Sequence, residues 1–167
     1  EVLMRLMRGP TWLSANETNH TIFGTPLNSH VGENHVEVLF FDGYNATLYE
    51  FTLNVTNTND HPVIDVRGTV TAIEDEKFDF EMKGHDPDPT DDVLTWEMVS
   101  GPDFLSLTED GFLLGTPGNE DVGIHTVDIV LRDNKGGIDE ISLSIEVTDV
   151  NDPPVVTDDN ADTDEDT

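Results

Sequence analysis

Two short acidic segments of the same type interrupt the chain, and each carries several side-chain oxygens. The first linker is Asn57-Thr58-Asn59-Asp60-His61-Pro62, and the second is Asp149-Val150-Asn151-Asp152-Pro153-Pro154. Carboxylate and amide oxygens are the ligands of hard cations such as Ca²⁺, which takes about six to eight of them at about 2.3–2.6 Å. No single short loop of this chain could supply that number. The pattern therefore indicates modules whose joints are held by a cation bound between several segments.

The composition favours metal ions over disulfides as cross-links. The chain has 36 acidic and 7 basic residues, a formal net charge of −29, and no cysteine. This charge excludes binding to nucleic acid, and anionic membrane surfaces repel it unless divalent ions intervene. No apolar run approaches the length needed to span a bilayer, and residues 1–5 lack the layout of a signal peptide. We expect the chain to be a piece of a longer protein.

The sequence repeats itself with an offset of 91 residues. Phe23-Gly24-Thr25-Pro26 recurs as Leu114-Gly115-Thr116-Pro117, and Val31-Gly32 recurs as Val122-Gly123. The Asn-Asp pair of the first linker recurs in the second linker at an offset of 92. A repeat of this length predicts tandem modules. We expect a partial first repeat that lacks its N-terminal strands, a complete second repeat, and an acidic tail that begins a following repeat, at residues 1–62, 63–154 and 155–167.

Alternation of apolar and polar residues predicts strands within the complete repeat. Residues 78–82 and 141–147 show the period of two, and turns rich in Gly, Pro and Asn separate such runs at short intervals. No window shows a helical stripe. These features predict an all-β fold made of immunoglobulin-like antiparallel β-sandwich repeats in tandem. Two sheets packed face to face would bury the alternating apolar residues.

The order of several motifs resembles that of a known family, the dystroglycan-type cadherin-like repeat. The motifs are Phe104-Leu105-Ser106-Leu107, the run from Gly111 to Gly123, Leu131-Arg132-Asp133-Asn134-Lys135-Gly136-Gly137, and the run from Thr148 to Pro154. The resemblance covers nearly the whole chain, with the first repeat counted as partial. It implies cadherin-like sandwiches in tandem, of a kind found in extracellular and cell-surface proteins.

The resemblance also implies a set of calcium ligands. In cadherin-like repeats the ligands come from the base of one module, from the linker and from the top of the next module. For the first joint this implies Asn57, Asn59, Asp60, Asp86, Asp88 and Asp133. For the second joint it implies Asp149, Asn151, Asp152, Glu74 and Asp121, with Glu76 or Glu120 as further candidates.

The first joint departs from the pattern of the second. Ser29-His30 stands where the second repeat has Glu120-Asp121, and Asn57 stands where the second linker has Asp149. Fewer carboxylates predict a weaker site or fewer ions at the first joint.

No catalytic set emerges from the sequence, which has no cysteine nucleophile, no Gly-x-Ser-x-Gly turn and no phosphate-binding Gly loop. We expect a non-enzymatic, calcium-binding structural or adhesion module of a secreted or cell-surface repeat protein. A calcium-dependent carbohydrate-binding module is the alternative, and a spacer in a large extracellular enzyme is a third reading. Expected partners are neighbouring repeats of the same chain, with another cell-surface protein or a polysaccharide as candidates. A truncated sandwich has open edges, so a strand-exchanged homodimer is also among the expected states.

Overall fold

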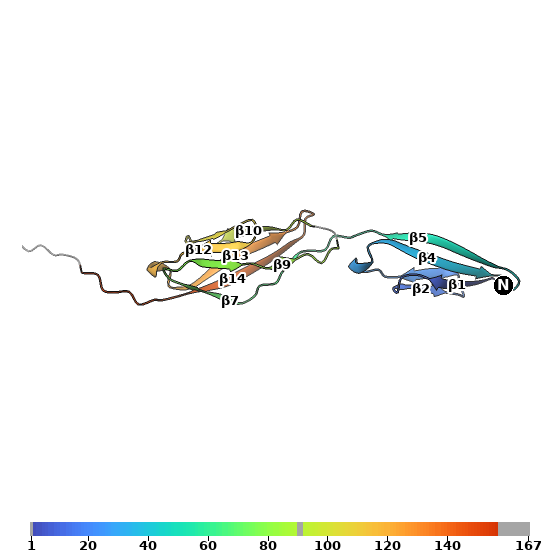
Figure 1. The fold of residues 1–167 in the computed structure, drawn as a ribbon, viewed down its shortest axis with the longest axis horizontal. Coiled ribbons are helices and arrows are strands. Elements are labelled where there is room, and N and C mark those ends of the chain that lie inside the picture. Colours follow the sequence, from blue (N-terminus) through green and yellow to red (C-terminus); the bar gives the residue numbers. More distant parts are fainter. Residues whose placement is uncertain (1, 90–91, 157–167) are drawn as a thin grey trace, which may run out of the picture.

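Strands make up nearly all of the regular structure, as the alternating pattern predicts. The computed structural model describes residues 2–89 and 92–156, and its two helical elements there are single 3₁₀ turns, η1 (Asn28–His30) and η2 (Asn119–Asp121). Within these residues no helix is both long enough and apolar enough to cross a membrane. Figure 1 shows two β domains that lie end to end, joined by the first linker.

The first domain contains one three-stranded sheet and one hairpin. The sheet has the order β1-β4-β5, and the hairpin is β2-β3. Strands β4 and β5 pair in antiparallel register from Gly32↔Val55 to Phe41↔Ala46. The bounds are β1 (Leu3–Arg8), β2 (Leu13–Asn16), β3 (Thr21–Gly24), β4 (Gly32–Phe41) and β5 (Ala46–Val55).

The second domain has more strands than the first. Four of them, β6 to β9, precede the strand β10, which pairs with β13 as β1 pairs with β4 in the first domain. The sheets of the second domain have the orders β10-β13-β14-β7, β11-β12-β8 and β6-β9. The bounds are β6 (Val63–Ile64), β7 (Thr69–Ile73), β8 (Phe78–Glu81), β9 (Gly84–His85), β10 (Thr95–Ser100), β11 (Leu105–Leu107), β12 (Phe112–Gly115), β13 (Gly123–Arg132) and β14 (Ile138–Thr148).

One strand pair differs from the antiparallel prediction. Strand β7 lies parallel to β14, from Ser144↔Thr69 to Thr148↔Ile73. Parallel neighbours need a long connection between them, and here the rest of the domain provides it. The other pairs between described strands are antiparallel.

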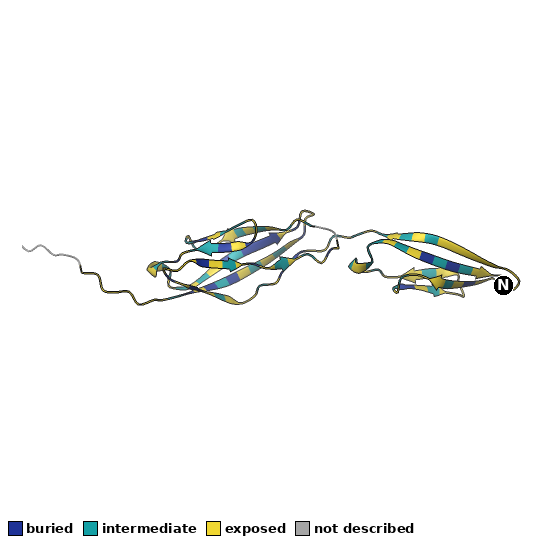
Figure 2. Ribbon diagram, viewed as in Figure 1, coloured by how far each residue is buried: buried dark blue, intermediate teal, exposed yellow. Residues whose placement is uncertain are grey.

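The core of the second domain lies between its sheets and is much larger than that of the first (Figure 2). Val127, Leu131, Leu143 and Ile145 are fully buried there, on alternating positions of β13 and β14. The buried cluster of the first domain is Met4, Leu13, Val36 and Val38. Apolar burial stabilises by about 25 cal/mol per Å², so the second domain gains more from its core.

The repeated Gly-Thr-Pro motif has a steric cause. A Cβ atom on Gly24 would lie 2.2 Å from the carbonyl oxygen of Trp12, and one on Gly115 would lie 2.4 Å from that of Phe104. The backbone therefore passes an aromatic residue so closely that only glycine fits. Both domains use the same packing, with Trp12 and Phe104 against their cores.

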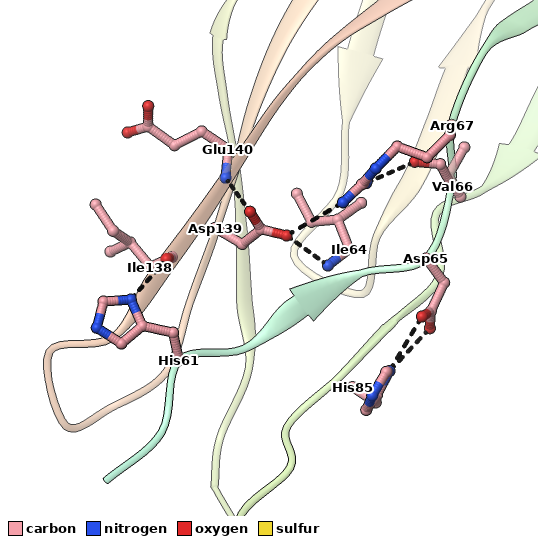
Figure 3. Close-up of polar contacts among 9 residues, drawn as sticks. All are labelled: His61, Ile64, Asp65, Val66, Arg67, His85, Ile138, Asp139 and Glu140. Carbon is pink, nitrogen blue, oxygen red and sulfur yellow. Dashed lines mark hydrogen bonds and ion pairs between the residues drawn. The ribbon is translucent and has the colours of Figure 1, made fainter.

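Asp139 fixes the start of the second domain (Figure 3). Its Oδ2 accepts a hydrogen bond from the backbone N–H of Ile64 at 2.8 Å, and Arg67 Nη2 lies 3.6 Å from the same oxygen. His61 Nδ1 lies 3.1 Å from the carbonyl oxygen of Ile138, which ties the end of the linker to the same strand. The chain therefore leaves the linker along β14 and is held there by polar contacts.

Candidate metal centre at the domain junction

The acidic turn after β9 gathers carboxylates at the top of the second domain. Asp86, Asp88 and Asp92 each offer an oxygen within 4.8 Å of the others. The backbone N–H of Asp88 donates to Asp86 Oδ1 at 2.9 Å, and this local bond folds the turn. Residues 2–89 and 92–156 contain no other group of three or more His or acidic side chains that converges as closely.

The first linker runs directly over this turn. The backbone N–H of Asp60 donates to Asp88 Oδ2 at 3.1 Å. The side-chain amide of Asn59 donates to Asp133 Oδ2 at 2.9 Å, which joins the linker to the β13-β14 hairpin. Three segments that are far apart in the sequence therefore meet at one end of the domain.

Asn28 brings the first domain into the same cluster. Its Nδ2 donates to Asp60 Oδ2 at 2.6 Å and to the carbonyl oxygen of Pro87 at 3.0 Å. Asn28 begins the short turn η1, so the base of the first domain contacts both the linker and the acidic turn. The junction thus contains side chains from both domains and from the connection between them.

Several oxygens at the junction are buried and have no hydrogen-bond donor among the described residues. They are Asn57 Oδ1, Asn59 Oδ1, Asp86 Oδ2, Asp88 Oδ1 and Asp92 Oδ2. Asp88 is only 8% exposed. A buried oxygen without a partner costs about 1–3 kcal/mol, and more when it carries charge. Oxygens of this kind, converging in one place, are the donor set that a hard cation satisfies.

The carboxylate of Asp133, unlike those oxygens, accepts several hydrogen bonds. Besides Asn59, the backbone N–H groups of Lys135 and Gly137 donate to its Oδ1 at 2.7 Å each. The hydrogen bond from Asn59 is the largest cause that lowers the pKa of Asp133 below its usual value, and burial acts in the opposite direction. Asp133 therefore remains a carboxylate that anchors both the hairpin and the linker.

Gly137 is required by the same close packing. A Cβ atom at this position would lie 2.2 Å from Asp133 Oδ2 and 3.1 Å from the carbonyl oxygen of Asp60. Any side chain would push the linker away from the hairpin. The second Gly of the Asn-Lys-Gly-Gly turn thus sets how closely the linker can approach.

Lys135 supplies a positive charge to the cluster. Its Nζ forms an ion pair with Asp92 Oδ1. The hydrogen bond to Asp92 raises the pKa of Lys135 above its usual value, burial opposes this, and the charges of Asp88 and Asp86 add to the increase. The lysine therefore stays protonated beside the aspartates.

The far end of the second domain carries a looser arrangement. Glu74 is only 1% exposed; its Oε1 accepts from the backbone N–H of Val150, and its Oε2 has no hydrogen-bond partner. Asp121 Oδ2 accepts from the backbone N–H of Gly118 at 2.9 Å. Asn119 Nδ2 donates to Asp152 Oδ2. Asp149 and Asn151 are exposed, as are Glu76 and Glu120.

The structure gathers the residues predicted for the first joint at the junction, whereas those predicted for the second joint form a looser arrangement. Asn57, Asn59, Asp60, Asp86, Asp88 and Asp133 all lie at the junction. The second set does not converge to the same degree within the described residues. Sequence reasoning missed Asn28 and its counterpart Asn119, although the offset of 91 pairs them. It also missed Asp92, which follows the acidic turn in sequence.

Comparison with known sequences identifies the family. A profile of the family described as Bacterial Ig domain matches residues 59–146, just over half of the chain. The chain belongs to this bacterial Ig domain family. A second profile, of another Ig domain family, matches residues 7–58, so two Ig-like domains follow one another. No curated protein sequence shows significant similarity to this bacterial Ig domain chain.

Solved structures share the fold of these bacterial Ig domains. EC1-2 of human protocadherin-24 has 14% identity and a TM-score of 0.64, and the match covers 89% of this chain and 82% of that chain. EC22-24 of mouse cadherin-23 has 15% identity and a TM-score of 0.64, covering 90% and 55%. An endo-fucoidan hydrolase of glycoside hydrolase family 107 has 23% identity and a TM-score of 0.49, and the match covers 87% of this chain but only 23% of the hydrolase. The two cadherin matches show that the tandem domains have a cadherin-like β-sandwich architecture.

The junction of these Ig domains has the chemistry of a metal site. Its available donors are carboxylate and amide oxygens, and they come from the linker and the acidic turn. The residues could hold a metal ion such as Ca²⁺ at the position where the two domains meet.

Proposed function

We propose that the chain is a calcium-binding pair of Ig-like modules, in which an ion at the junction fixes one domain relative to the next. The observation that carries this proposal is the set of buried oxygens without donors around Asp86, Asp88 and Asp92. Asn57 and Asn59 would add amide oxygens from the linker. The protein would supply the coordinating oxygens, and the ion would supply positive charge beyond that of Lys135.

Calcium fits this donor set better than its common competitors. Zn²⁺ prefers Cys and His ligands, and the junction offers oxygens. Mg²⁺ demands a near-ideal octahedron and retains waters, whereas Ca²⁺ accepts irregular arrangements of carboxylates and amide oxygens. The ligands here come from loops and a linker, so the arrangement is irregular.

An ion at the junction would act on stiffness more than on folding. Two carboxylates about 4 Å apart repel by about 4 kcal/mol at an effective dielectric near 20, so an ion-free cluster favours separation of the segments that carry it. Extracellular calcium modules bind at about 10⁻⁴–10⁻³ M, and an ion at ten times its dissociation constant adds about 1.4 kcal/mol. Asn28 already contacts the linker and the acidic turn. Calcium would lock this contact and hold the two domains in line.

We also propose a second ion site at the opposite end of the second domain. The support is Glu74, which is buried with an unpartnered oxygen. Asp121, Asp149, Asn151 and Asp152 are the candidate ligands around it. Because these side chains do not converge in the described residues, we expect the ion to draw them together.

The proposal extends to the family and its setting. The motif order resembles that of dystroglycan-type cadherin-like repeats, and the cadherin-like fold of the solved structures is consistent with that resemblance. We infer a structural or adhesive role in a secreted or cell-surface repeat protein. We also infer that the module has no catalytic activity of its own.

Calcium titration by calorimetry, combined with small-angle scattering, tests the proposal. We expect saturable binding in the submillimolar to millimolar range and a narrower distribution of end-to-end distances in calcium than in chelator. Asp88→Asn and Asp86→Asn should weaken binding, because each removes charge from the cluster. Asp79→Asn is the matched control, since Asp79 is exposed on β8 and pairs with Lys77.

Absence of binding heat at 10 mM calcium, with identical scattering in calcium and chelator, would mean that the acidic cluster serves solubility alone. Binding that survives Asp88→Asn and Asp86→Asn unchanged would place the ion elsewhere in the chain.

A further inference from the structure

Lys135 is placed differently from the other two lysines of the chain. Lys77 pairs with Asp79 at 3.0 Å, and Lys83 lies 3.9 Å from Glu81; in both pairs the acidic partner is about half exposed. Lys135 is 36% exposed, but the side chain of its partner Asp92 is 0% exposed. Its ammonium group therefore reaches from the surface to a buried carboxylate.

A hydrogen bond holds the backbone of Lys135 in its hairpin, while the ammonium group lies at the end of a long, flexible side chain. Lys135 lies between β13 and β14, and its backbone N–H donates to Asp133 Oδ1 at 2.7 Å. Four methylene groups separate this fixed backbone from Nζ, and the side chain keeps a path to solvent. The charge can therefore enter or leave the cluster without any change in the hairpin.

The cluster needs a positive charge when no metal is bound. Asp86, Asp88 and Asp92 lie within 4.8 Å of one another, and Asp88 is buried with an unpartnered oxygen. All three aspartates raise the pKa of Lys135, Asp92 the most. Its ammonium group is thus the local charge that offsets the repulsion among them.

We propose that Lys135 is a tethered cation that occupies the Asp86/Asp88/Asp92 cluster in the metal-free protein and that an incoming calcium ion must displace it. This inference rests on the proposed function of the junction and deepens it. Competition from the lysine lowers the affinity for calcium and stabilises the metal-free junction. The lysine thereby sets the calcium concentration at which the joint stiffens.

The variant Lys135→Gln removes the charge and keeps most of the side-chain length. We expect its calcium dissociation constant to fall about threefold to tenfold, because both the ion pair and the general repulsion of Ca²⁺ are lost. Its thermal midpoint should fall in chelator and equal that of the wild type in saturating calcium. Lys77→Gln, which breaks an exposed pair far from the junction, is the matched control.

NMR of the lysine side chains distinguishes displacement of the Lys135 ammonium group from a charge effect that acts without movement. Reductive methylation with ¹³C-formaldehyde keeps the charge on each lysine and gives each a separate NMR signal. On calcium addition the Lys135 signal should move toward the position of a freely solvated dimethyl-lysine, while those of Lys77 and Lys83 stay in place. Lys135→Met, which lacks any polar head group, should show the same gain in affinity as Lys135→Gln.

The results separate this inference from the one it rests on. If wild-type protein binds no calcium, the proposed function fails and the inference fails with it. If wild type binds calcium, but Lys135→Gln binds with unchanged affinity and the Lys135 signal does not shift, the inference alone is overturned. A lower midpoint of Lys135→Gln in both chelator and calcium would also overturn it, since that result indicates a purely structural lysine.

Discussion

The side-chain amide of Asn28 lies 2.6 Å from Asp60 Oδ2, and this bond joins the base of the first domain to the linker. Asn119 and Asp152 repeat the contact at the far end of the second domain. Each asparagine begins a 3₁₀ turn just after the Gly-Thr-Pro motif. The recurrence indicates that the module carries its linker contact as a built-in feature of each repeat.

Asn28→Ala should therefore loosen the joint without unfolding either domain. A hydrogen bond to a charged group contributes about 1.5–3 kcal/mol, so the lost contact should weaken calcium binding by about tenfold or more. Calorimetry measures the affinity, and circular dichroism should show an unchanged fold. Asn54→Ala, at an exposed position on β5, is the control. Equal affinities for the two variants would show that Asn28 does not support the site.

Gly137→Ala should separate the linker from the hairpin. The added Cβ would lie 2.2 Å from Asp133 Oδ2, and overpacking of this kind costs about 1–3 kcal/mol. Chemical denaturation should show the loss, and calcium affinity should fall with it. Gly118→Ala is a matched control, because a Cβ there meets nothing within 4 Å. If both variants are equally stable, the packing at Gly137 is less restrictive than these contacts require.

The strand architecture could be predicted from the sequence because its causes are local. Alternation within residues 141–147 requires a strand, and the strand is β14. The roles of the linker and of Asp86-Pro87-Asp88 as candidate ligand segments could likewise be predicted, since several side-chain oxygens lie close together in the sequence. The parallel pairing of β7 with β14 was not, because the pattern of a strand does not reveal the direction of its neighbour.

Three residues of the junction could not be predicted from the sequence pattern alone. Lys135 reaches Asp92 from a hairpin far away in sequence, and no local pattern records that approach. Asp92 lies outside the stretches of the second repeat that align with the first at the repeat offset. Asn28 is neutral, so a search for acidic ligands passes over it, although alignment at the repeat offset pairs it with Asn119.

Glu74→Gln tests the ion site at the far end of the second domain. The variant keeps the shape of a buried side chain whose Oε2 lacks a partner, and it removes the charge. The stabilisation of this domain by calcium should fall by about 1.4 kcal/mol at ten times the dissociation constant. Thermal unfolding in calcium and in chelator measures the difference. Glu81→Gln alters an exposed residue of the same domain that belongs to neither proposed ligand set, and it should behave as wild type. An unchanged calcium response in Glu74→Gln would exclude an ion there.

Asp128 gives a pH dependence that is independent of metal. Ser142 and Ser100 donate to its carboxylate at 2.6 and 2.7 Å, and these bonds, that from Ser142 most, lower the pKa of Asp128 below its usual value. A lowered pKa in the folded state stabilises the protein above the unfolded pKa, near 4, and this contribution is lost as the pH falls through the folded pKa. Ser142→Ala should raise the pKa of Asp128, measured in chelator by carboxyl ¹³C NMR.

The control for Asp128 lies in the same domain. Ser106 donates to the carbonyl oxygen of Leu114 at 3.2 Å and to no carboxylate in the described contacts. Ser106→Ala should therefore leave the titration of Asp128 as it is in the wild type. A pKa for Asp128 that is identical in Ser142→Ala and wild type would rule out the serine bonds as its cause.

The outer side of β5 should exchange its amide hydrogens much faster than the matching side of β14. Residues 144–147 pair with β13 on one side and with β7 on the other, whereas among the described strands β5 pairs with β4 alone. Backbone groups without a partner exchange at rates close to those of unprotected amides. Hydrogen exchange by NMR should show this at alternate residues of 52–55. Protection there as strong as in β14, together with sedimentation as a dimer, would instead indicate that a strand of a second copy pairs with this edge of β5.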